Sequence, residues 1–387
     1  MSKPLTIVMV HQGAELYGSD RSFLSALAAL RERHPDALID VVLPEPGPLV
    51  DLVARYASRI QYDENGVLRK KKLKARPFRT LKDMAFSWLR FRRMFASYDI
   101  CYVNTVVCVA AIMALRLRQR GSYVHVREIP SKLALRVFNT MLKFSRASLI
   151  YNSNATAGAF GLRGTVIHNG VEVRGDVTSA APRSVRPLRL AIIGRINPWK
   201  GQQFVLDALA TLGRALPVEI RIVGAVFPGY EALLSQLQHA AANCAQRVEI
   251  SGFTDDPSVH YQWADFALVP STLPEPFGRV AVESFAMKRP VIAAAHGGLQ
   301  EIVVDGVNGF LFQPADDRDF VCTLERAVAT RATEYVAMAE AARQAYLDSF
   351  TERSYMNAIV NCITPDDGEK PMPDQAPAAS AATGIPQ

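Results

Sequence analysis

Apolar and polar positions follow one repeating pattern through the first 170 residues. Short apolar runs are separated by longer stretches with helical spacing, such as Ser22–Arg33 and Val106–Arg120. The runs that predict buried strands are Leu5–Val10, Ile39–Leu43, Ile100–Asn104, Tyr123–Val126 and Leu149–Tyr151. Regular alternation of strand and helix predicts a parallel sheet that is covered by helices on both faces.

The pattern breaks at residues 174–187, which are rich in Pro, Ser and Arg, and then resumes. The strands predicted beyond the break are Leu188–Ile193, Glu219–Val223, Val248–Ser251, Phe266–Val269 and Val291–Ala294. We therefore expect an α/β chain with two doubly wound domains, residues 1–172 and 188–345, joined by a linker at 173–187. Their carboxyl-end edges are expected to face each other across a ligand-binding cleft. A helix at 346–363 is expected to return to the first domain, and a tail at 364–387 to be disordered.

Composition narrows the class of protein. The chain has 387 residues, of which 49% are hydrophobic and 21% charged, so two globular domains are expected. Its five cysteines include no CxxC pair, which argues against a disulfide framework and a zinc site. The first apolar run is too short for a signal peptide, and the longest, Val106–Leu115, is shorter than the roughly 20 residues that span a bilayer. A cytoplasmic protein is therefore expected.

Charge is distributed unevenly between the two halves. Residues 1–172 hold 26 Lys and Arg against 13 Asp and Glu, whereas residues 173–387 hold 18 against 24. A large anionic partner, either a membrane surface or a nucleic acid, would therefore bind the first half. From Arg69 to Arg93 cations alternate with aromatic residues, a pattern that suits a helix lying on anionic lipid. A solvated basic loop before an ordinary core helix is the alternative, and no recognisable module predicts nucleic-acid binding.

The first candidate site is the segment Gly194–Gly201, which directly follows a predicted strand. Its cations Arg195 and Lys200 could converge on one anion at the mouth of the sheet. A diphosphate suits the combination of an arginine fork and a lysine point charge. Two solvated cations on an ordinary strand-to-helix loop remain the alternative. The segment matches neither a Walker A sequence nor a GxGxxG fingerprint.

The second candidate site is a proline-rich loop after another predicted strand. It holds Glu275, and a helix is expected to begin near Gly278, with the amides of Phe277, Gly278 and Arg279 at its N-terminus. Such amides can donate to sugar hydroxyls or to anionic oxygens. Glu283 falls about one turn into the helix, so two carboxylates are expected to border one pocket. The alternative makes Glu275 a helix-start carboxylate and Glu283 a solvated residue.

In this order and spacing, the two blocks resemble the retaining GT-B glycosyltransferases of family 4, also called glycosyl transferases group 1. The resemblance is densest from Leu188 to Phe312, and it rests on the segments GRINPWKG, SGFTDD, PSTLPEPFGRVAVE, RPVIAAAHGGLQEIVVDGVNGFLF and HNGV. It implies metal-independent transfer from a UDP- or GDP-sugar, without a cofactor, to a glycan or lipid-linked acceptor. It further implies surface-polysaccharide or lipopolysaccharide biosynthesis at the inner face of the cytoplasmic membrane, to which the Arg69–Arg93 region would attach the protein.

The resemblance assigns roles to the candidate residues of the second domain. Arg195 and Lys200 would neutralise the donor diphosphate and the charge that builds on it as the glycosidic bond breaks. Glu283 would bind the ribose hydroxyls, while Glu275 and the amides after it would hold the donor sugar. Gly297 and Gly298 match the family's glycine pair in a loop that lines the cleft.

In the first domain, the resemblance points to two loops. Gly18 and Ser19 follow the first predicted strand, where the family has a paired-glycine loop near the phosphates; Tyr17 stands in the place of the first glycine. His125 ends a predicted strand, and the resemblance implies that it contacts the donor sugar, with the acidic residue Glu128 three positions later. Without the resemblance, a lone histidine at a strand end is more often structural.

The mechanism implied is front-face attack, in which the acceptor hydroxyl enters beside the departing diphosphate. No residue in the sequence stands out as the base. Two alternatives remain: a catalytically inactive GT-B scaffold that binds membranes or nucleic acid, and a sugar-nucleotide epimerase. The presence of both cations and both carboxylates argues against an inactive scaffold, and the PEPFG segment argues against an epimerase.

Overall fold

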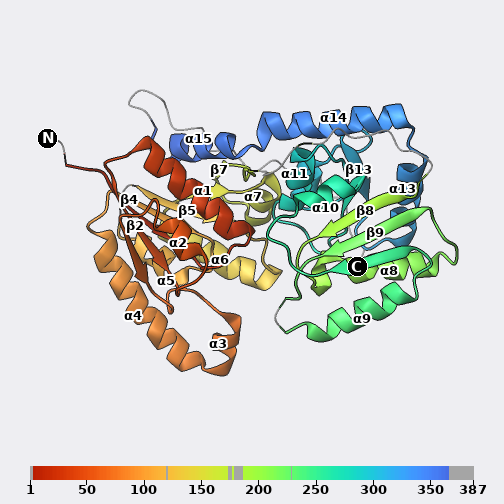
Figure 1. The fold of residues 1–387 in the computed structure, drawn as a ribbon. Helices are drawn as coiled ribbons and strands as arrows, with labels where there is room; N and C mark the ends of the chain where they lie inside the picture. The colour runs from red at the N-terminus through yellow and green to blue at the C-terminus, as the bar shows by residue number, and fades with distance from the viewer. Residues whose placement is uncertain (1–2, 119–120, 173–176, 178–185, 228, 366–387) are drawn as a thin grey trace. The chain divides into compact units, whose positions relative to one another are not determined.

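The computed structural model describes residues 3–118, 121–172, 177, 186–227 and 229–365. Most of the expected linker at 173–187 and nearly all of the expected tail at 364–387 lie outside these described residues. The chain separates into two compact units (Figure 1). Unit 1 consists of Met1–Gly170 together with the segment that begins at Glu352, and unit 2 is Val171–Thr351.

Unit 1 contains a seven-stranded parallel sheet with the order β3-β2-β1-β4-β5-β6-β7. Its strands are β1 (Thr6–Val10), β2 (Leu38–Leu43), β3 (Arg59–Tyr62), β4 (Ile100–Asn104), β5 (Ser122–Val126), β6 (Ser148–Tyr151) and β7 (Thr165–Val166). The five strands predicted for this half are confirmed to within one residue at each end. The two outermost strands were missed, because β3 alternates with polar residues and β7 has only two residues.

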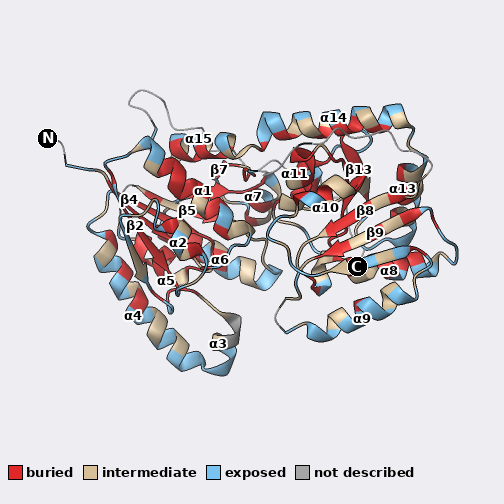
Figure 2. Ribbon diagram, viewed as in Figure 1, coloured by how far each residue is buried: buried red, intermediate tan, exposed pale blue. Residues whose placement is uncertain are grey.

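The helices of unit 1 lie on both faces of this sheet. They are α1 (Gly18–Arg33), α2 (Leu49–Val53), α3 (Lys70–Ala75), α4 (Pro77–Phe95), α5 (Val109–Leu115), α6 (Lys132–Ser145), α7 (Asn154–Phe160) and α15 (Glu352–Ile363). Successive residues of β1 point to opposite faces of the sheet and belong to different hydrophobic cores. Val8 lies in the core with α4, α5 and α6, and Ile7 lies in the core with α1, α2 and α15. Figure 2 shows the strands buried between these layers. The helix expected at Val106–Arg120 is shorter, since α5 covers only its middle.

The C-terminal helix returns to unit 1, as expected. α15 packs along α1, and its Tyr355 and Ile359 belong to the core around Phe23. The single helix expected at 346–363 is instead two, because α14 (Ala332–Ser349) ends before α15 begins. At the break, the backbone pairs with another segment: the amide of Val171 donates to the carbonyl of Phe350 (3.0 Å).

Unit 2 contains a six-stranded parallel sheet with the order β10-β9-β8-β11-β12-β13. Its strands are β8 (Leu188–Ile193), β9 (Val218–Val223), β10 (Arg247–Ser251), β11 (Phe266–Val269), β12 (Val291–Ala294) and β13 (Gly309–Phe312). All five strands predicted for this half are present, and β13 is additional. Together, the two sheets confirm the α/β class with two doubly wound, Rossmann-like domains.

Helices also cover both faces of the second sheet. They are α8 (Gln202–Thr211), α9 (Glu231–Ala242), α10 (Ser258–Trp263), α11 (Arg279–Ala286), α12 (Leu299–Ile302), α13 (Asp317–Ala329) and α14, with a 3-10 turn η1 (Pro198–Lys200). α8, α9 and α13 pack on one face, and α10, α11 and α12 on the other. The strand order reverses between β8 and β11, so the loops after β8, β11 and β12 share the carboxyl edge where doubly wound sheets bind ligands.

The packing of α15 yields a testable expectation about unit 1. Ile359 is completely buried, so Ile359→Ala should destabilise this unit by about 2–5 kcal/mol, through lost apolar contacts and the cavity left behind. Hydrogen exchange in peptides from α1 measures the effect separately from unit 2. Asn357→Ala, at an exposed position of the same helix, is the matched control and should change protection little. Equal exchange in the two variants would show that α15 does not stabilise α1.

Candidate functional site

Two loops at the carboxyl edge of the second sheet are packed directly against each other. Gly201 has a left-handed backbone with φ of 76°, and a Cβ there would lie 1.9 Å from the carbonyl oxygen of Pro270. Only glycine fits this approach. The amide of Thr272 donates to the carbonyl of Trp199 (2.9 Å), which ties the loop after β11 to the loop after β8. The side chain of Asn197 caps the turn η1 by accepting from the amide of Lys200 (3.0 Å).

An ion pair joins the same two loops. Nζ of Lys200 lies 2.6 Å from Oε1 of Glu275, and the hydroxyl of Ser271 donates to that oxygen. The pair is partly screened from solvent, since the Lys200 side chain is 26% exposed and the Glu275 side chain 13%. Burial alone would raise the pKa of the Glu275 carboxyl. The charge of Lys200 and the hydrogen bonds from Lys200 and Ser271 outweigh burial and hold this pKa below its ordinary value.

His296 is a neighbour of this pair that sequence reasoning did not select. Its Nε2 donates to the carbonyl oxygen of Ser271 (2.6 Å), so it connects the loop after β12 to the loop after β11. Burial lowers the pKa of His296, although the Ser271 carbonyl and the charge of Glu275 oppose the shift. The motif contained a signal, because His296 directly precedes the glycine pair; the partner at Ser271 required the structure.

The glycine pair packs against the backbone of the second loop. Gly297 has φ of 61°, and a Cβ there would lie 2.2 Å from the carbonyl oxygen of Glu275. A Cβ on Gly298 would lie 2.4 Å from the carbonyl oxygen of Phe277, and the Gly298 amide donates to the Glu275 carbonyl (2.8 Å). Glycine is therefore needed here for close approach of two backbones. This packing fixes the backbone on both sides of the Glu275 side chain.

The expected helix begins where the sequence predicted it. α11 starts at Arg279 after Gly278, whose φ of 108° only glycine adopts readily. This brings the amides of Phe277, Gly278 and Arg279 to the helix N-terminus. The Phe277 side chain is buried and packs edge-to-face on Phe350, with ring centroids 6.0 Å apart, so this residue offers the site its backbone and not its ring.

Glu283 has a different set of partners from Glu275. One carboxylate oxygen accepts from Nε of Arg279 (2.8 Å) and the other from the hydroxyl of Tyr261 (3.0 Å). Burial, together with the neighbouring carboxylate, raises the pKa of Tyr261 well above its ordinary value, so its hydroxyl remains a donor. The structure thus pairs Arg279 with Glu283 and Lys200 with Glu275, giving two ion pairs on neighbouring segments.

Arg195 and Lys200 share a loop but have different neighbours. The guanidinium of Arg195 lies over the ring of Phe227, 5.2 Å from its centroid. The carbonyl of Arg195 accepts from the side chain of Gln202 (3.1 Å), which fixes the loop to the start of α8. Arg195 as a whole is half-buried.

In unit 1, Gly18 and Ser19 form the first turn of α1 and are half-buried. The turn is fixed by Asp20, whose carboxylate accepts from the amide of Tyr17 (2.8 Å) and lies 2.7 Å from Nε2 of His11. Burial lowers the pKa of His11, and the contact with Asp20 opposes that shift. The amides of the two candidate residues therefore belong to a rigid helix start.

His125 lies at the end of β5 and is completely buried. Its Nδ1 is 2.7 Å from the hydroxyl of Tyr102 and 3.2 Å from the guanidinium of Arg127. Burial, reinforced by the charge of Arg127, lowers the pKa of His125 well below its ordinary value. Burial raises the pKa of Glu128, whose carboxylate accepts from the Arg127 amide (3.2 Å). Contact between His125 and a donor sugar stays a prediction.

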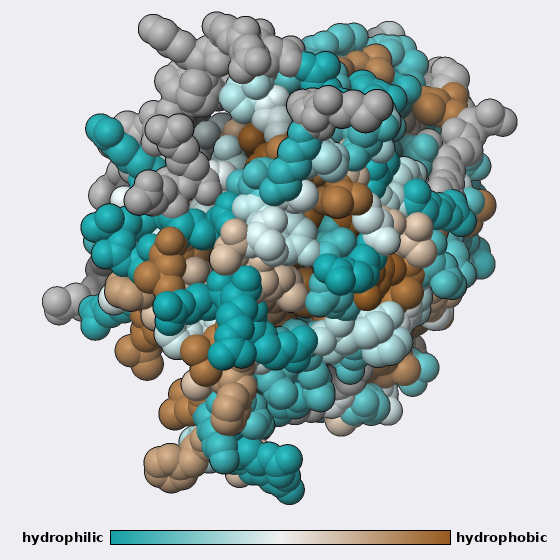
Figure 3. All heavy atoms as spheres, turned by 90° about the vertical axis from the view of Figure 1, so that its left-hand side faces the viewer, coloured by the Kyte–Doolittle hydropathy of each residue, from teal (hydrophilic) through white to brown (hydrophobic). Residues whose placement is uncertain are grey.

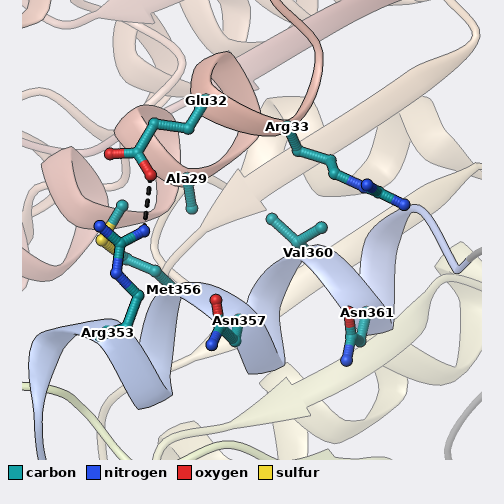
Figure 4. Close-up of a pocket in the computed structure, with 8 residues that line it drawn as sticks. All are labelled: Ala29, Glu32, Arg33, Arg353, Met356, Asn357, Val360 and Asn361. Carbon is teal, nitrogen blue, oxygen red and sulfur yellow. Dashed lines mark hydrogen bonds and ion pairs between the residues drawn. The ribbon is translucent and has the colours of Figure 1, made fainter.

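Among the described residues, unit 1 has hollows that lie outside these loops. One, of about 330 Å³, lies between α1 and α15, with the Glu32–Arg353 ion pair and Met356 on its walls (Figure 4). Another, of about 550 Å³, lies between α5 and α6 beside Val137 and Phe144. Within the described residues, no cluster of His, Cys, Asp or Glu could hold a metal ion, and no helix is long and apolar enough to cross a bilayer.

Comparison with known proteins finds one family model that matches the segment holding these loops. Residues 187–330, which contain all three loops of unit 2, match the model of the family described as glycosyl transferases group 1. The chain is 34% identical over 192 residues to a D-inositol 3-phosphate glycosyltransferase of Geodermatophilus obscurus, an alignment that covers 45% of this chain and 42% of that protein. It is 30% identical over 157 residues to a lipopolysaccharide 1,2-N-acetylglucosaminetransferase of Salmonella typhimurium, covering 38% and 41%. The chain thus spans about two fifths of the length of the curated relatives it matches.

Solved structures show the same fold across most of the chain. The Anabaena protein HepE, crystallised with UDP and glucose, superposes with a TM-score of 0.73 at 23% identity, over 92% of this chain and 98% of that one. WaaG, a glycosyltransferase involved in lipopolysaccharide biosynthesis, superposes with a TM-score of 0.64 at 15% identity, over 93% and 100%. The fold is therefore GT-B.

The close approach at Gly201 yields a stability test. Gly201→Ala should destabilise unit 2 through the collision with Pro270 as well as through its left-handed backbone. Gly213→Ala is the matched control, because Gly213 has a similar φ of 67° with open space around it, so only the conformational cost of about 1–2 kcal/mol applies. Urea unfolding compares the two free energies. An equal loss in both variants would mean that the two loops separate at no cost.

Proposed function

We propose that the chain, whose residues 187–330 match the model of the glycosyl transferases group 1, is a retaining, metal-independent glycosyltransferase. It would move a sugar from a nucleoside-diphosphate donor to a carbohydrate or lipid-linked acceptor. The observation that carries this proposal is the cluster of Lys200, Glu275, Ser271 and His296 at the carboxyl edge of the unit 2 sheet, beside the N-terminus of α11.

The charges of this cluster suit a departing diphosphate. An ammonium has three N–H donors, and Glu275 accepts one from Lys200, which orients the side chain and leaves donors for phosphate oxygens. The amides at the start of α11 and the guanidinium of Arg195 add positive potential that is fixed before the reaction. Such preorganised charge stabilises a transition state in which the diphosphate gains negative charge as the sugar gains oxocarbenium character.

The carboxylates would recognise the rest of the donor. Glu275 is held ionised, so its second oxygen is an acceptor for a sugar hydroxyl. Glu283 is oriented by Arg279 and Tyr261, and we assign it to the ribose hydroxyls. The acceptor hydroxyl would attack from the side of the leaving diphosphate, whose oxygens can take up its proton. Front-face attack of this kind requires no separate enzymic base or nucleophile.

The comparisons support the class of donor and of acceptor. HepE was crystallised with UDP-glucose, and the Salmonella relative is named as a lipopolysaccharide transferase. We propose a UDP- or GDP-sugar as donor and a cell-surface glycan or glycolipid precursor as acceptor. The protein would then work as a peripheral protein on the inner face of the cytoplasmic membrane.

The surface of the protein that would bind the membrane is the exposed side of α4. Phe78, Leu81 and Phe86 are exposed there, whereas Phe91 and Phe95 on the other side are buried. Figure 3 faces the side of the molecule on which α4 lies and shows hydrophobic patches among hydrophilic side chains. Among the described residues, the cations without a carboxylate partner in this region include Lys74, Arg76, Lys82 and Arg93. Apolar side chains flanked by unpaired cations favour binding to anionic lipid.

The donor class is tested by thermal unfolding with UDP-, GDP- and ADP-glucose. A ligand at 100 times its dissociation constant stabilises the native state by about 2.7 kcal/mol, so the correct nucleotide should raise the midpoint of unit 2 unfolding. The variant Arg195→Met should lose the shift in part, because one cation remains. No shift with any nucleotide sugar would contradict a donor site.

The ion pair is tested by Lys200→Ala. We expect kcat to fall about 10²–10³-fold, the loss typical when one preorganised donor to a developing anion is removed. Lys288→Ala is the matched control, because Lys288 also pairs with a glutamate, Glu340, but lies at the end of α11. Release of nucleoside diphosphate measures both rates. Full turnover by Lys200→Ala would remove the assigned role.

Membrane binding is tested by sedimentation with phosphatidylglycerol vesicles, using pure phosphatidylcholine vesicles as reference. The double change Lys82→Glu and Arg93→Glu should lower partitioning by at least tenfold, since each cation near an anionic surface contributes about 1 kcal/mol. Phe78→Ser should also weaken binding, and Phe253→Ser, at an exposed phenylalanine of unit 2, should not. If only changes at the exposed α6 residue Val137 reduced binding, the assignment to α4 would be wrong.

A further inference from the structure

A network of buried polar side chains in unit 1 is centred on Arg127, which directly follows β5. Its guanidinium donates to Oδ1 of Asn104 (2.6 Å), to Oδ1 of Asn169 (2.5 Å) and to the hydroxyl of Tyr355 (2.7 Å). These partners come from the end of β4, from the segment just before unit 2, and from α15. Arg127 is only 6% exposed, and these three acceptors are uncharged. The charge is therefore held in place by hydrogen bonds.

The same guanidinium determines which nitrogen of His125 carries the proton. Nη2 of Arg127 lies 3.2 Å from Nδ1 of His125, and the hydroxyl of Tyr102 lies 2.7 Å from the same nitrogen. An arginine can only donate hydrogen bonds, so Nδ1 must be an acceptor without a proton. A neutral imidazole with a bare Nδ1 carries its hydrogen on Nε2.

The other nitrogen of this ring is unsatisfied. Nε2 of His125 is buried and has no hydrogen-bond partner in the part of the chain that the structure describes. Buried donors without acceptors are rare in native proteins, so this N–H is available to a water molecule or to a bound ligand. A positively charged ring is disfavoured here by burial and by the adjacent guanidinium. The ring is therefore a neutral donor that lacks an acceptor.

Arg127 also determines the tautomer of a second buried histidine, His11. Because Oδ1 of Asn104 accepts from Arg127, the amide group of Asn104 is oriented with Nδ2 toward Nδ1 of His11 (2.8 Å). Nδ1 of His11 is then also an acceptor, and its Nε2 hydrogen points to the carboxylate of Asp20 (2.7 Å). One guanidinium thus sets the same tautomer in two histidines, directly in one and through an amide in the other.

We propose that Arg127 and Tyr102 are positioning residues that hold His125 as a neutral imidazole protonated at Nε2, so that it donates a hydrogen bond to a substrate oxygen and does not accept a proton during transfer. The role for His125 rests on the proposed glycosyltransferase function; the tautomer does not. Among the described residues, the charged and titratable groups around the ring include Arg127 beside it, Tyr102 on β4, Tyr355 on α15, the buried carboxyl of Glu128 next to Arg127, and the His11–Asp20 pair beyond Asn104.

The tautomer is tested on the ligand-free, full-length protein by ¹⁵N NMR of the imidazole nitrogens, with His125 and His11 assigned from single His→Gln variants. We expect protonated Nε2 and unprotonated Nδ1 in both neutral rings, and for His125 this state should persist across roughly pH 5–8, where an ordinary histidine changes its charge. A proton on Nδ1 of His125, or a charged ring within this range, would overturn the proposal. The measurement needs no activity, so its result stands whether or not transfer is detected.

Substitutions test the chemical role. The amide nitrogen of glutamine can take the place of Nε2, and that of asparagine the place of Nδ1, so His125→Gln should retain far more kcat than His125→Asn. Equal loss of kcat in the two folded variants would contradict a role as a donor from Nε2. If the native enzyme shows a pH inflection that His125→Gln lacks, His125 acts as a base and the proposal is wrong.

Tyr102→Phe should leave the tautomer unchanged and broaden the His125 NMR signals, because Arg127 alone then holds the ring. A switch of the proton to Nδ1 in Tyr102→Phe would show that Arg127 does not set the tautomer.

Discussion

The Lys200–Glu275 ion pair is the contact on which the arrangement of the unit 2 site depends. It joins the loop after β8 to the loop after β11, and Ser271 and His296 extend it to the loop after β12. These strands are neighbours at the point where the sheet order reverses, so the topology brings the loops together and the ion pair fixes their side chains. A partly buried pair remains favourable because hydrogen bonds surround it.

The polar groups described in the two units differ in how far they are buried. In unit 2, the Lys200–Glu275 pair at the sheet edge stays partly exposed, which the proposed binding of a donor requires. In unit 1, the guanidinium of Arg127 is almost completely enclosed, and its hydrogen bonds define the orientation of an amide and two imidazoles. The first arrangement provides electrostatic potential, and the second provides precise geometry. A sugar transferase would use both, because charge stabilises the departing diphosphate and geometry selects the sugar.

The sequence predicted the α/β class, the central strands of both sheets and the start of α11, because each strand is a clear apolar run and the helix follows a motif with a restricted backbone. The structure brings Lys200 and Glu275, both selected from the sequence, into one ion pair, and their roles toward a donor stay predictions. The sequence did not reveal Ser271 and His296 as partners of the Lys200–Glu275 pair, or Arg127 as the centre of the unit 1 network. Hydrogen bonds between segments far apart in the chain leave no periodic pattern. The edge strand β3 was missed because its sequence alternates polar and apolar residues and lacks the continuous apolar run of a central strand. The strand β13 was missed although it is apolar, because a run of four residues does not by itself distinguish a strand from other buried structure.

Unit 1 is discontinuous in the chain, since all of Val171–Thr351 is inserted between its sheet and α15. Ribosomes synthesise proteins from the N-terminus, so the seven strands emerge well before Tyr355, which supplies an acceptor to Arg127 and covers α1. Synthesis of unit 2 begins later than that of unit 1, but it is complete before α15 of unit 1 has been made. The unit whose translation begins first is therefore the last to be completed, and until α15 leaves the ribosome α1 lacks the apolar partner that covers it in the folded unit.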